Sequence, residues 1–154
     1  MYSLKRHAPN SDDFPVILDL VRHAFAYMDG IVEPASTVHL MSVASLQKNA
    51  ETGEVWTLGT PIVGCMVLTP KDDMLYLGKL AVADSERGKG LARVLIEHAC
   101  VRAKSLGLTG VELGTRIELT NNQRAFEKMG FVEFERECHP GFDRHTAITY
   151  RRAV

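Results

Sequence analysis

The sequence is poor in cysteine, and this shortage excludes two kinds of protein. Its 154 residues include three cysteines, Cys65, Cys100 and Cys138, and no two of them form a C-x-x-C pair. An odd, widely spaced set of this kind predicts reduced thiols rather than a disulfide framework or a zinc site. We therefore expect a cytoplasmic protein that holds no metal.

Long apolar runs are missing as well. Residues 55–70 form a run of 16 without Asp, Glu, Lys or Arg, but Gly59, Pro61 and Gly64 interrupt it. A helix that spans a membrane needs about 20 apolar residues, so we expect no membrane segment. The basic residues Lys5 and Arg6 precede a polar stretch, which does not fit a secretory signal peptide.

The net charge is also close to zero. The sequence has 18 Lys and Arg against 19 Asp and Glu, a formal net charge of −1. No overall field therefore attracts the chain to nucleic acid or to an anionic membrane, and we expect neither as a partner. The length suits one domain, residues 1–154, with a sizeable core. Any anion binding must come from a local cluster.

One such cluster is the segment R-G-K-G-L-A at residues 87–92. It follows an apolar segment with the pattern of a strand and opens an amphipathic helix. Its two glycines expose backbone N–H groups, Arg87 and Lys89 add positive charge, and the helix start adds the positive end of a dipole. This combination favours a ligand with several phosphate charges.

Two common phosphate motifs do not fit this segment. The dinucleotide fingerprint G-x-G-x-x-G needs a third glycine where Arg93 stands. A Walker loop needs Ser or Thr after its lysine, whereas Gly90 follows Lys89. The pattern R-x-x-G-x-A remains, and the alternative interpretation of so short a pattern is a solvated glycine turn without a ligand.

Hydrophobic periodicity and turn residues predict the other elements. We expect strands at Tyr2–Arg6, Val55–Leu58, Ile62–Leu68, Met74–Ala83, Val111–Leu113, Phe131–Glu137 and Thr146–Arg151, and helices at 11–30, Thr37–Asn49, Gly90–Leu106 and Asn121–Met129. This order, β-α-α-β-β-β-α-β-α-β-β, predicts an α/β (α+β) fold with a mixed sheet and helices on both faces.

The pattern at 87–92 resembles the signature of the GNAT superfamily of acyl-CoA-dependent N-acetyltransferases. The preceding LGKLAVAD, residues 77–84, looks like the fourth strand of that family, and Asn122 with F-E-K-M-G-F at 126–131 resembles a second family motif. The resemblance implies a GNAT-like, mostly antiparallel sheet. It also implies acetyl-CoA as co-substrate and an amine of a small molecule, peptide or protein as acceptor. Homodimers are common in that family, so a homodimer stays open.

The resemblance also implies roles for individual residues. The N–H groups of residues 87–92 would hold the pyrophosphate of coenzyme A, and the strand would bulge near Ala81–Ala83 and separate from its neighbour. The Val82 amide would stabilise the oxyanion of the reaction. The expected cofactor-binding residues are Leu80, Ala81, Val82, Arg87, Gly88, Lys89, Gly90, Leu91, Ala92, Asn122 and Phe126.

The sequence does not indicate clearly which residues are the general acid and the general base of the reaction. Many relatives carry a tyrosine, the general acid, where this chain has Phe126, so Phe126 is expected beside the pantetheine arm or in the core. Asn122 is a hydrogen-bond donor to the cofactor arm or simply a residue of a helix start. The candidate bases or amine anchors lie in two loops, where solvated positions are commoner than catalytic ones. They are Glu33, His39, His139, Asp143 and His145, with Glu112 facing either the cleft or solvent.

Two other interpretations stay open at this stage. The absent tyrosine favours a non-catalytic acyl-CoA-binding module that kept the cofactor site. Cys138 is a conceivable acyl-carrying nucleophile, but the sequence shows no partner to activate it.

Overall fold

The structure, a computed structural model, describes residues 2–154 and centres on a seven-stranded sheet in the order β1-β2-β3-β4-β5-β7-β6. Among these neighbours β4 and β5 run parallel and the other pairs run antiparallel. This confirms the expected mixed, mostly antiparallel sheet. The strands are β1 Leu4–His7, β2 Glu54–Leu58, β3 Gly64–Lys71, β4 Met74–Val82, β5 Gly110–Arg116, β6 Val132–Glu137 and β7 Ala147–Ala153.

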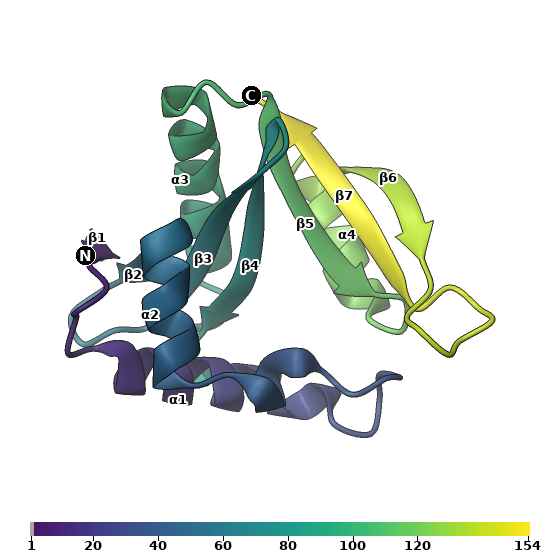
Figure 1. Cartoon of the computed structure of the whole chain (residues 1–154), viewed down its shortest axis with the longest axis horizontal. Coiled ribbons are helices and arrows are strands. Elements are labelled where there is room, and N and C mark those ends of the chain that lie inside the picture. The colour runs from purple at the N-terminus through teal and green to yellow at the C-terminus, as the bar shows by residue number, and fades with distance from the viewer. Residues whose placement is uncertain (1) are drawn as a thin grey trace.

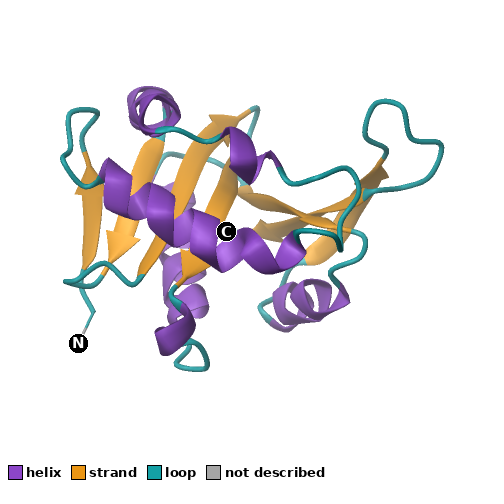
Figure 2. Cartoon of the chain, turned by 90° about the horizontal axis from the view of Figure 1, so that it is seen from below, coloured by secondary structure: helices purple, strands orange, loops and turns teal. Residues whose placement is uncertain are grey.

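Helices cover both faces of the sheet (Figure 2). Helices α1, Phe14–Phe25, and α2, Val43–Thr52, pack on one face through a cluster that includes Phe14, Ile17 and Leu46. Helix α3, Leu91–Ser105, packs on the other through Leu95, Ile96 and Ala99, and α4, Thr120–Lys128, adds Phe126 to that cluster. Burial of these apolar stripes is the main driving force for the layered fold.

Two expected helices differ from the observed ones. The helix expected over 11–30 begins at Phe14, ends at Phe25 and continues as the 3₁₀ turn η1, Ala26–Met28. The single helix expected over Thr37–Asn49 is two elements, the 3₁₀ turn η2, Thr37–Leu40, and α2. Ser42 causes the break, because its side chain and that of Ser45 cap the start of α2 reciprocally.

Strand β3 is longer than expected at its C-terminal end. The strand expected over Ile62–Leu68 continues through Lys71, and Asp72 with a φ of 55° makes the turn before β4. Pro70 has no N–H to donate. It is tolerated there because β3 pairs with β2 only as far as Leu68, so no strand on that side would accept a hydrogen bond from residue 70.

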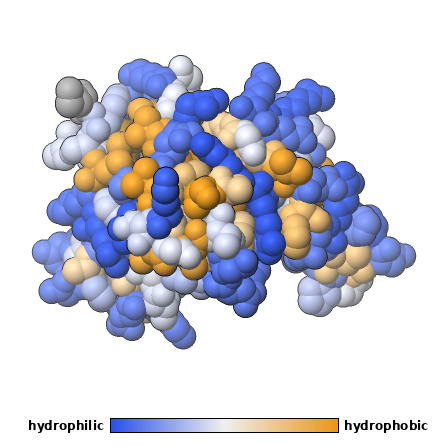
Figure 3. Space-filling view, turned by 90° about the horizontal axis from the view of Figure 1, so that it is seen from above, coloured by the Kyte–Doolittle hydropathy of each residue, from blue (hydrophilic) through white to orange (hydrophobic). Residues whose placement is uncertain are grey.

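Strands β4 and β5 position the site. They pair only from Met74 to Tyr76 and from Gly110 to Glu112, although both strands continue beyond these residues. In Figure 1 they lie side by side at the upper end and diverge toward the lower end. We call the interval beyond Tyr76 and Glu112, over which the two strands do not pair, the opening. The face of the molecule that is seen from above in Figure 3 presents apolar and hydrophilic side chains intermixed. None of the helices in residues 2–154 has the length and apolar character needed to cross a bilayer.

Candidate functional site

The opening between β4 and β5 contains a bulge in β4. Val67 of β3 lies opposite Gly78, and Cys65 lies opposite Ala81, so β4 carries one residue more than β3 across this interval. Lys79 accommodates the extra residue with a left-handed φ of 53°. The position expected for the bulge, Ala81–Ala83, is therefore wrong, and separation of the strands already follows Tyr76.

Beyond the bulge, β4 offers backbone groups to the opening while its side chains pack. Leu80 and Val82 contact the core under α3, and Ala81 is buried against the α1 side. The Ala83 N–H donates to Val63 O of the segment before β3 at 2.8 Å. Because successive N–H groups of a strand point in opposite directions, the Val82 N–H points away from β3, toward the opening.

The loop after β4 leads into an uncapped helix start. Gly88 and Gly90 have φ values of 79° and 77°, in the left-handed region that glycine tolerates. A Cβ at either position would meet no protein atom within 4 Å. Gly90 is the N-cap of α3 and supplies no side-chain cap, so the first N–H groups of the helix face open space. The side chain of Leu91, the first residue of α3, is by contrast buried in the core.

Acidic residues of the 3₁₀ turn η3, Asp84–Glu86, pair with the two cations of the loop. Arg87 Nη2 lies 3.0 Å from Asp84 Oδ1, and Lys89 Nζ lies 2.7 Å from Glu86 Oε2. These exposed pairs are weak in water, so they leave both cations available to a stronger anion. The hydrogen bond from Lys89 lowers the pKa of Glu86, which keeps the carboxylate charged.

Helix α4 brings two predicted residues to the far side of the opening. Asn122 Nδ2 donates to Tyr27 Oη at 3.3 Å, which ties α4 to the end of η1. Phe126 packs against the rings of Phe131 and Tyr150, with centroids 6.1 and 6.4 Å away. The phenylalanine ring thus forms part of the core beneath the sheet and carries no proton to transfer.

Two arginines fasten the segment between α1 and α2 to the β5 side. Arg116 donates to the carbonyl oxygens of Pro34 and Ala35, at 2.6 and 3.2 Å, and Arg144 contacts Glu33 at 3.0 Å. Glu118, which the sequence analysis missed, accepts the Glu33 N–H through Oε2. Its Oε1 is buried and has no hydrogen-bond partner among residues 2–154. An unpaired buried carboxylate oxygen is costly unless a donor reaches it.

The histidine candidates are separated from one another. His39 contacts Asp29 at 2.6 Å in the α1–α2 connection, and His139 is hydrogen-bonded through Nδ1 to Thr146 in the β6–β7 connection. Asp143 and His145 are exposed in that second loop. The structure therefore brings Glu33 and Glu118 together but not the histidines.

On the face of α1 and α2, a polar cluster lies at the closed end of the opening, where β4 and β5 are still paired. Glu112 is buried there and is not solvent-facing, because its two oxygens accept hydrogen bonds from Lys71 at 3.2 Å and Arg151 at 2.8 Å. Tyr76, the residue paired with Glu112 in register, belongs to this cluster. The sequence indicates this face for Tyr76, because Tyr76 lies between Leu75 and Leu77, whose side chains face α3.

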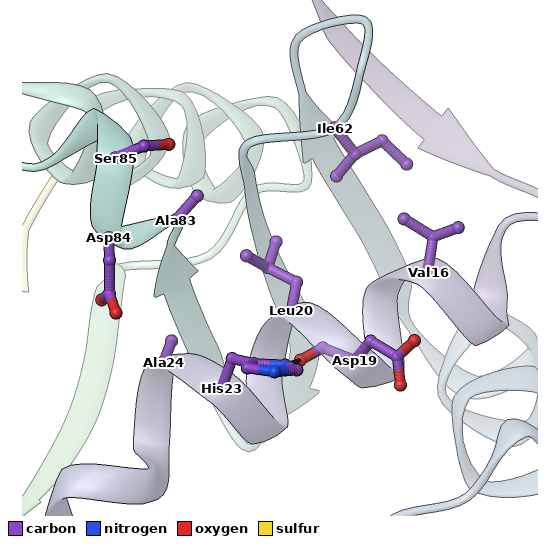
Figure 4. Close-up of a pocket in the computed structure, with 9 residues that line it drawn as sticks. All are labelled: Val16, Asp19, Leu20, His23, Ala24, Ile62, Ala83, Asp84 and Ser85. Atoms are coloured by element: carbon purple, nitrogen blue, oxygen red, sulfur yellow. Dashed lines mark hydrogen bonds between the residues drawn. The ribbon is translucent and has the colours of Figure 1, made fainter.

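A separate shallow groove borders the end of β4. It has a volume of ≈ 420 Å³ and lies between α1 and the segment Ala83–Ser85 (Figure 4). Leu20 and Ile62 give it an apolar wall, while His23, whose Nδ1 bonds to Asp19 O, stands at its edge. The groove runs beside the expected cofactor strand rather than between β4 and β5.

A family model described as "Acetyltransferase (GNAT) family" matches residues 20–131. The chain belongs to the GNAT acetyltransferase family. This membership supports acyl transfer with a CoA-type co-substrate, and it confirms the resemblance noted in the sequence. No curated protein matches the sequence significantly.

Solved structures agree in fold. The chain superposes on "paia n-acetyltransferase" from Thermoplasma acidophilum in complex with coenzyme A with a TM-score of 0.81 and 13% identity, covering 100% of this chain and 99% of that chain. A GNAT family acetyltransferase from Elizabethkingia anophelis with acetyl-CoA bound gives 0.71 and 18%, covering 99% and 98%. The ribosomal-protein-S18-alanine N-acetyltransferase from Escherichia coli gives 0.71 and 19%, covering 100% and 94%. At these identities the likeness establishes the fold.

Proposed function

We propose that residues 1–154 form a single N-acetyltransferase domain that transfers the acetyl group of acetyl-CoA directly to an amine of a small molecule or protein. One observation carries this proposal. Parallel strands separate after Tyr76 and Glu112, and β4 then leads into a loop whose Gly88 and Gly90 leave open space before an uncapped helix start. An elongated ligand with a pyrophosphate group fits a narrow backbone-lined opening that ends at such a loop.

The residues present suit coenzyme A. Backbone N–H groups of residues 87–92 would hold the pyrophosphate, with Arg87 and Lys89 close by. The backbone groups of Leu80 and Val82, which face away from β3, would pair with the pantetheine arm in the manner of an added strand, with Ala81 between them. Asn122 and Phe126 would border the arm from α4.

In the proposed reaction a neutral amine attacks the thioester carbon. An alkylamine has a pKa of about 10.4, so it must lose a proton before attack, whereas a thiol of pKa about 8.5 leaves readily. The Val82 N–H would stabilise the developing oxyanion, and one such donor contributes roughly 10²–10³ in rate. Glu118 Oε1, together with Glu33, would attract the amine to the mouth of the opening.

The proposal is tested by calorimetric titration with coenzyme A followed by thiol release from acetyl-CoA. The acceptor panel contains amino acids, polyamines, aminoglycosides and peptides. Binding together with thiol release that depends on one acceptor class supports the proposal. The absence of coenzyme A binding would overturn it.

A second function is a non-catalytic acyl-CoA-binding module. The observation that favours it is Phe126, which packs with Phe131 and Tyr150 where many relatives have a catalytic hydroxyl. Tight binding of coenzyme A without thiol release across the whole panel would select this module over the enzyme.

A further inference from the structure

Tyr76 is the last residue of β4 that pairs with β5, so its side chain lies where the opening begins. A Cβ at Gly114 of β5 would lie 3.4 Å from Tyr76 Oη, and a Cβ at Gly78 would lie 3.4 Å from Cε1 of its ring. The ring therefore lies beside two positions without side chains, and its hydroxyl lies over β5. Any side chain larger than glycine at 114 would fill the space in front of this hydroxyl.

The face on which Tyr76 lies follows from register. Tyr76 lies opposite Thr69 of β3, and two residues further on Val67 lies opposite Gly78. Val67 belongs to the cluster beneath α1 and α2, so Gly78 and Tyr76 lie on that face of the sheet as well. The same face carries the α1–α2 connection with Glu33, which Arg116 of β5 fastens next to the opening.

The phenol of Tyr76 is kept neutral by its surroundings. Burial raises the pKa of Tyr76, and the carboxylates of Glu112 and Glu137 raise it further, whereas Lys71, 5.5 Å from the ring centroid, acts in the opposite direction. The hydroxyl consequently has a proton to give throughout the neutral pH range.

Other groups near the opening are less suited to move a proton. Phe126 has no hydroxyl, and its ring packs in the core. Both oxygens of Glu112 are held by Lys71 and Arg151. His139 is bonded to Thr146 in the distal β6–β7 connection. Unlike these three side chains, Tyr76 carries a hydroxyl, and it lies at the start of the opening.

We infer that the Tyr76 hydroxyl is the proton-transfer group of the acyl transfer, taking the part that a tyrosine at position 126 cannot play in this chain. This inference rests on the proposed function. The amine nitrogen forms a bond to the thioester carbon, and the carbon–sulfur bond breaks with its electron pair on sulfur. Tyr76 gives its proton to that sulfur and receives the proton that the nitrogen loses. The products are the amide and the free thiol, and the phenol is restored.

The test compares the Tyr76→Phe variant with the unaltered chain in the rate of thiol release from acetyl-CoA. The acceptor is the amine that gives the fastest release in the panel above. General acid–base groups contribute about 10²–10⁴ in rate, so kcat should fall by about 100-fold or more while KM for acetyl-CoA stays within about twofold. Tyr150→Phe is the matched control, because Tyr150 faces α4 and its hydroxyl contacts Glu127 at 3.5 Å. This control should keep kcat within about threefold.

A second variant guards against a folding defect in the first. Gly114→Ala keeps the hydroxyl but places a methyl group 3.4 Å from it, and it should lower kcat several-fold with unchanged coenzyme A affinity. A Tyr76→Phe protein that binds coenzyme A normally and retains kcat within threefold would overturn the inference. A rise in KM for the amine with unchanged kcat would also overturn it, because the hydroxyl would then bind the acceptor only. If the unaltered chain releases no thiol with any amine, the proposed function itself fails.

Discussion

Gly90 and Gly107 share one backbone conformation but lie at opposite ends of α3. Their φ values are 77° and 73°, and a Cβ at either position would meet nothing within 4 Å. A side chain in the left-handed region costs roughly 1–2 kcal/mol at both. The pair therefore separates the backbone cost of a substitution from any effect on ligand binding.

Gly90→Glu should weaken binding of coenzyme A by at least about tenfold, equivalent to about 1.4 kcal/mol. The physical reason is that the new side chain and its negative charge would occupy the space proposed for the pyrophosphate. Calorimetric titration measures the affinity, and thermal unfolding measures the stability. Gly107→Glu should lose a similar amount of stability and keep its affinity. Equal affinities in the two variants would remove the loop from the binding site.

Whether the sequence predicts a functional residue depends on how far along the chain its neighbours in space lie. The loop 87–92 was predicted as an anion site because its glycines, cations and helix start are neighbours in the sequence. Tyr76 and Glu118 were not predicted, because each is placed at the site by a contact with a residue distant in the sequence. Tyr76 lies beside Gly114 and Glu118 beside Glu33 only in the folded chain. Sequence periodicity alone did not reveal either neighbourhood.

At the scale of elements, Glu54 connects β2 to α3. It is 4% exposed and accepts hydrogen bonds from Arg102 Nε at 2.8 Å, Arg102 Nη2 at 2.7 Å and Trp56 Nε1 at 2.8 Å. The hydrogen bonds from Arg102 lower the pKa of Glu54, although burial alone would raise it. In the unfolded chain this pKa returns to about 4.3. The connection therefore stabilises the fold above that pH and is lost as the pH falls through the lower folded-state value.

Glu54→Gln should lower the free energy of unfolding by roughly 3 kcal/mol at neutral pH, because it leaves the Arg102 guanidinium without its charged partner. The difference from the unaltered chain should shrink as the pH falls from about 4.3 through the lower folded-state pKa of Glu54, below which Glu54 is neutral in both states. Urea unfolding at several pH values measures it. Glu51→Gln, an exposed change on α2, should stay within about 0.5 kcal/mol. A difference that does not vary with pH would contradict this account.

Element boundaries were predictable where a local signal marks them. The strand 74–82 and the helix after it were predicted nearly to the residue, because Gly90 and the apolar stripe mark the helix start. The bulge in β4 was misplaced because Lys79 gives no sequence signal for a left-handed φ. Helix α2 was expected to start too early, because the 3₁₀ turn Thr37–Leu40 lies directly before the Ser42 cap and only the cap separates the two elements.

At the scale of the whole molecule, the order of elements and the two motifs together pointed to the fold, and the family comparison confirms it. The acceptor was not predictable, because the residues around the opening come from separate connections. Glu33, Glu118 and Arg144 meet there from three parts of the chain. Contacts of this kind depend on the closed fold rather than on any local pattern.

The most direct measurement of the central claim is a crystal structure of the full chain grown with coenzyme A. The account predicts the pyrophosphate within hydrogen-bond distance of the N–H groups of residues 88–92. It predicts the pantetheine arm between β4 and β5, with its thiol beyond Val82 on the side toward the Tyr76 hydroxyl. Coenzyme A bound in the groove beside α1, or bound with its pyrophosphate away from Gly88 and Gly90, would contradict the account.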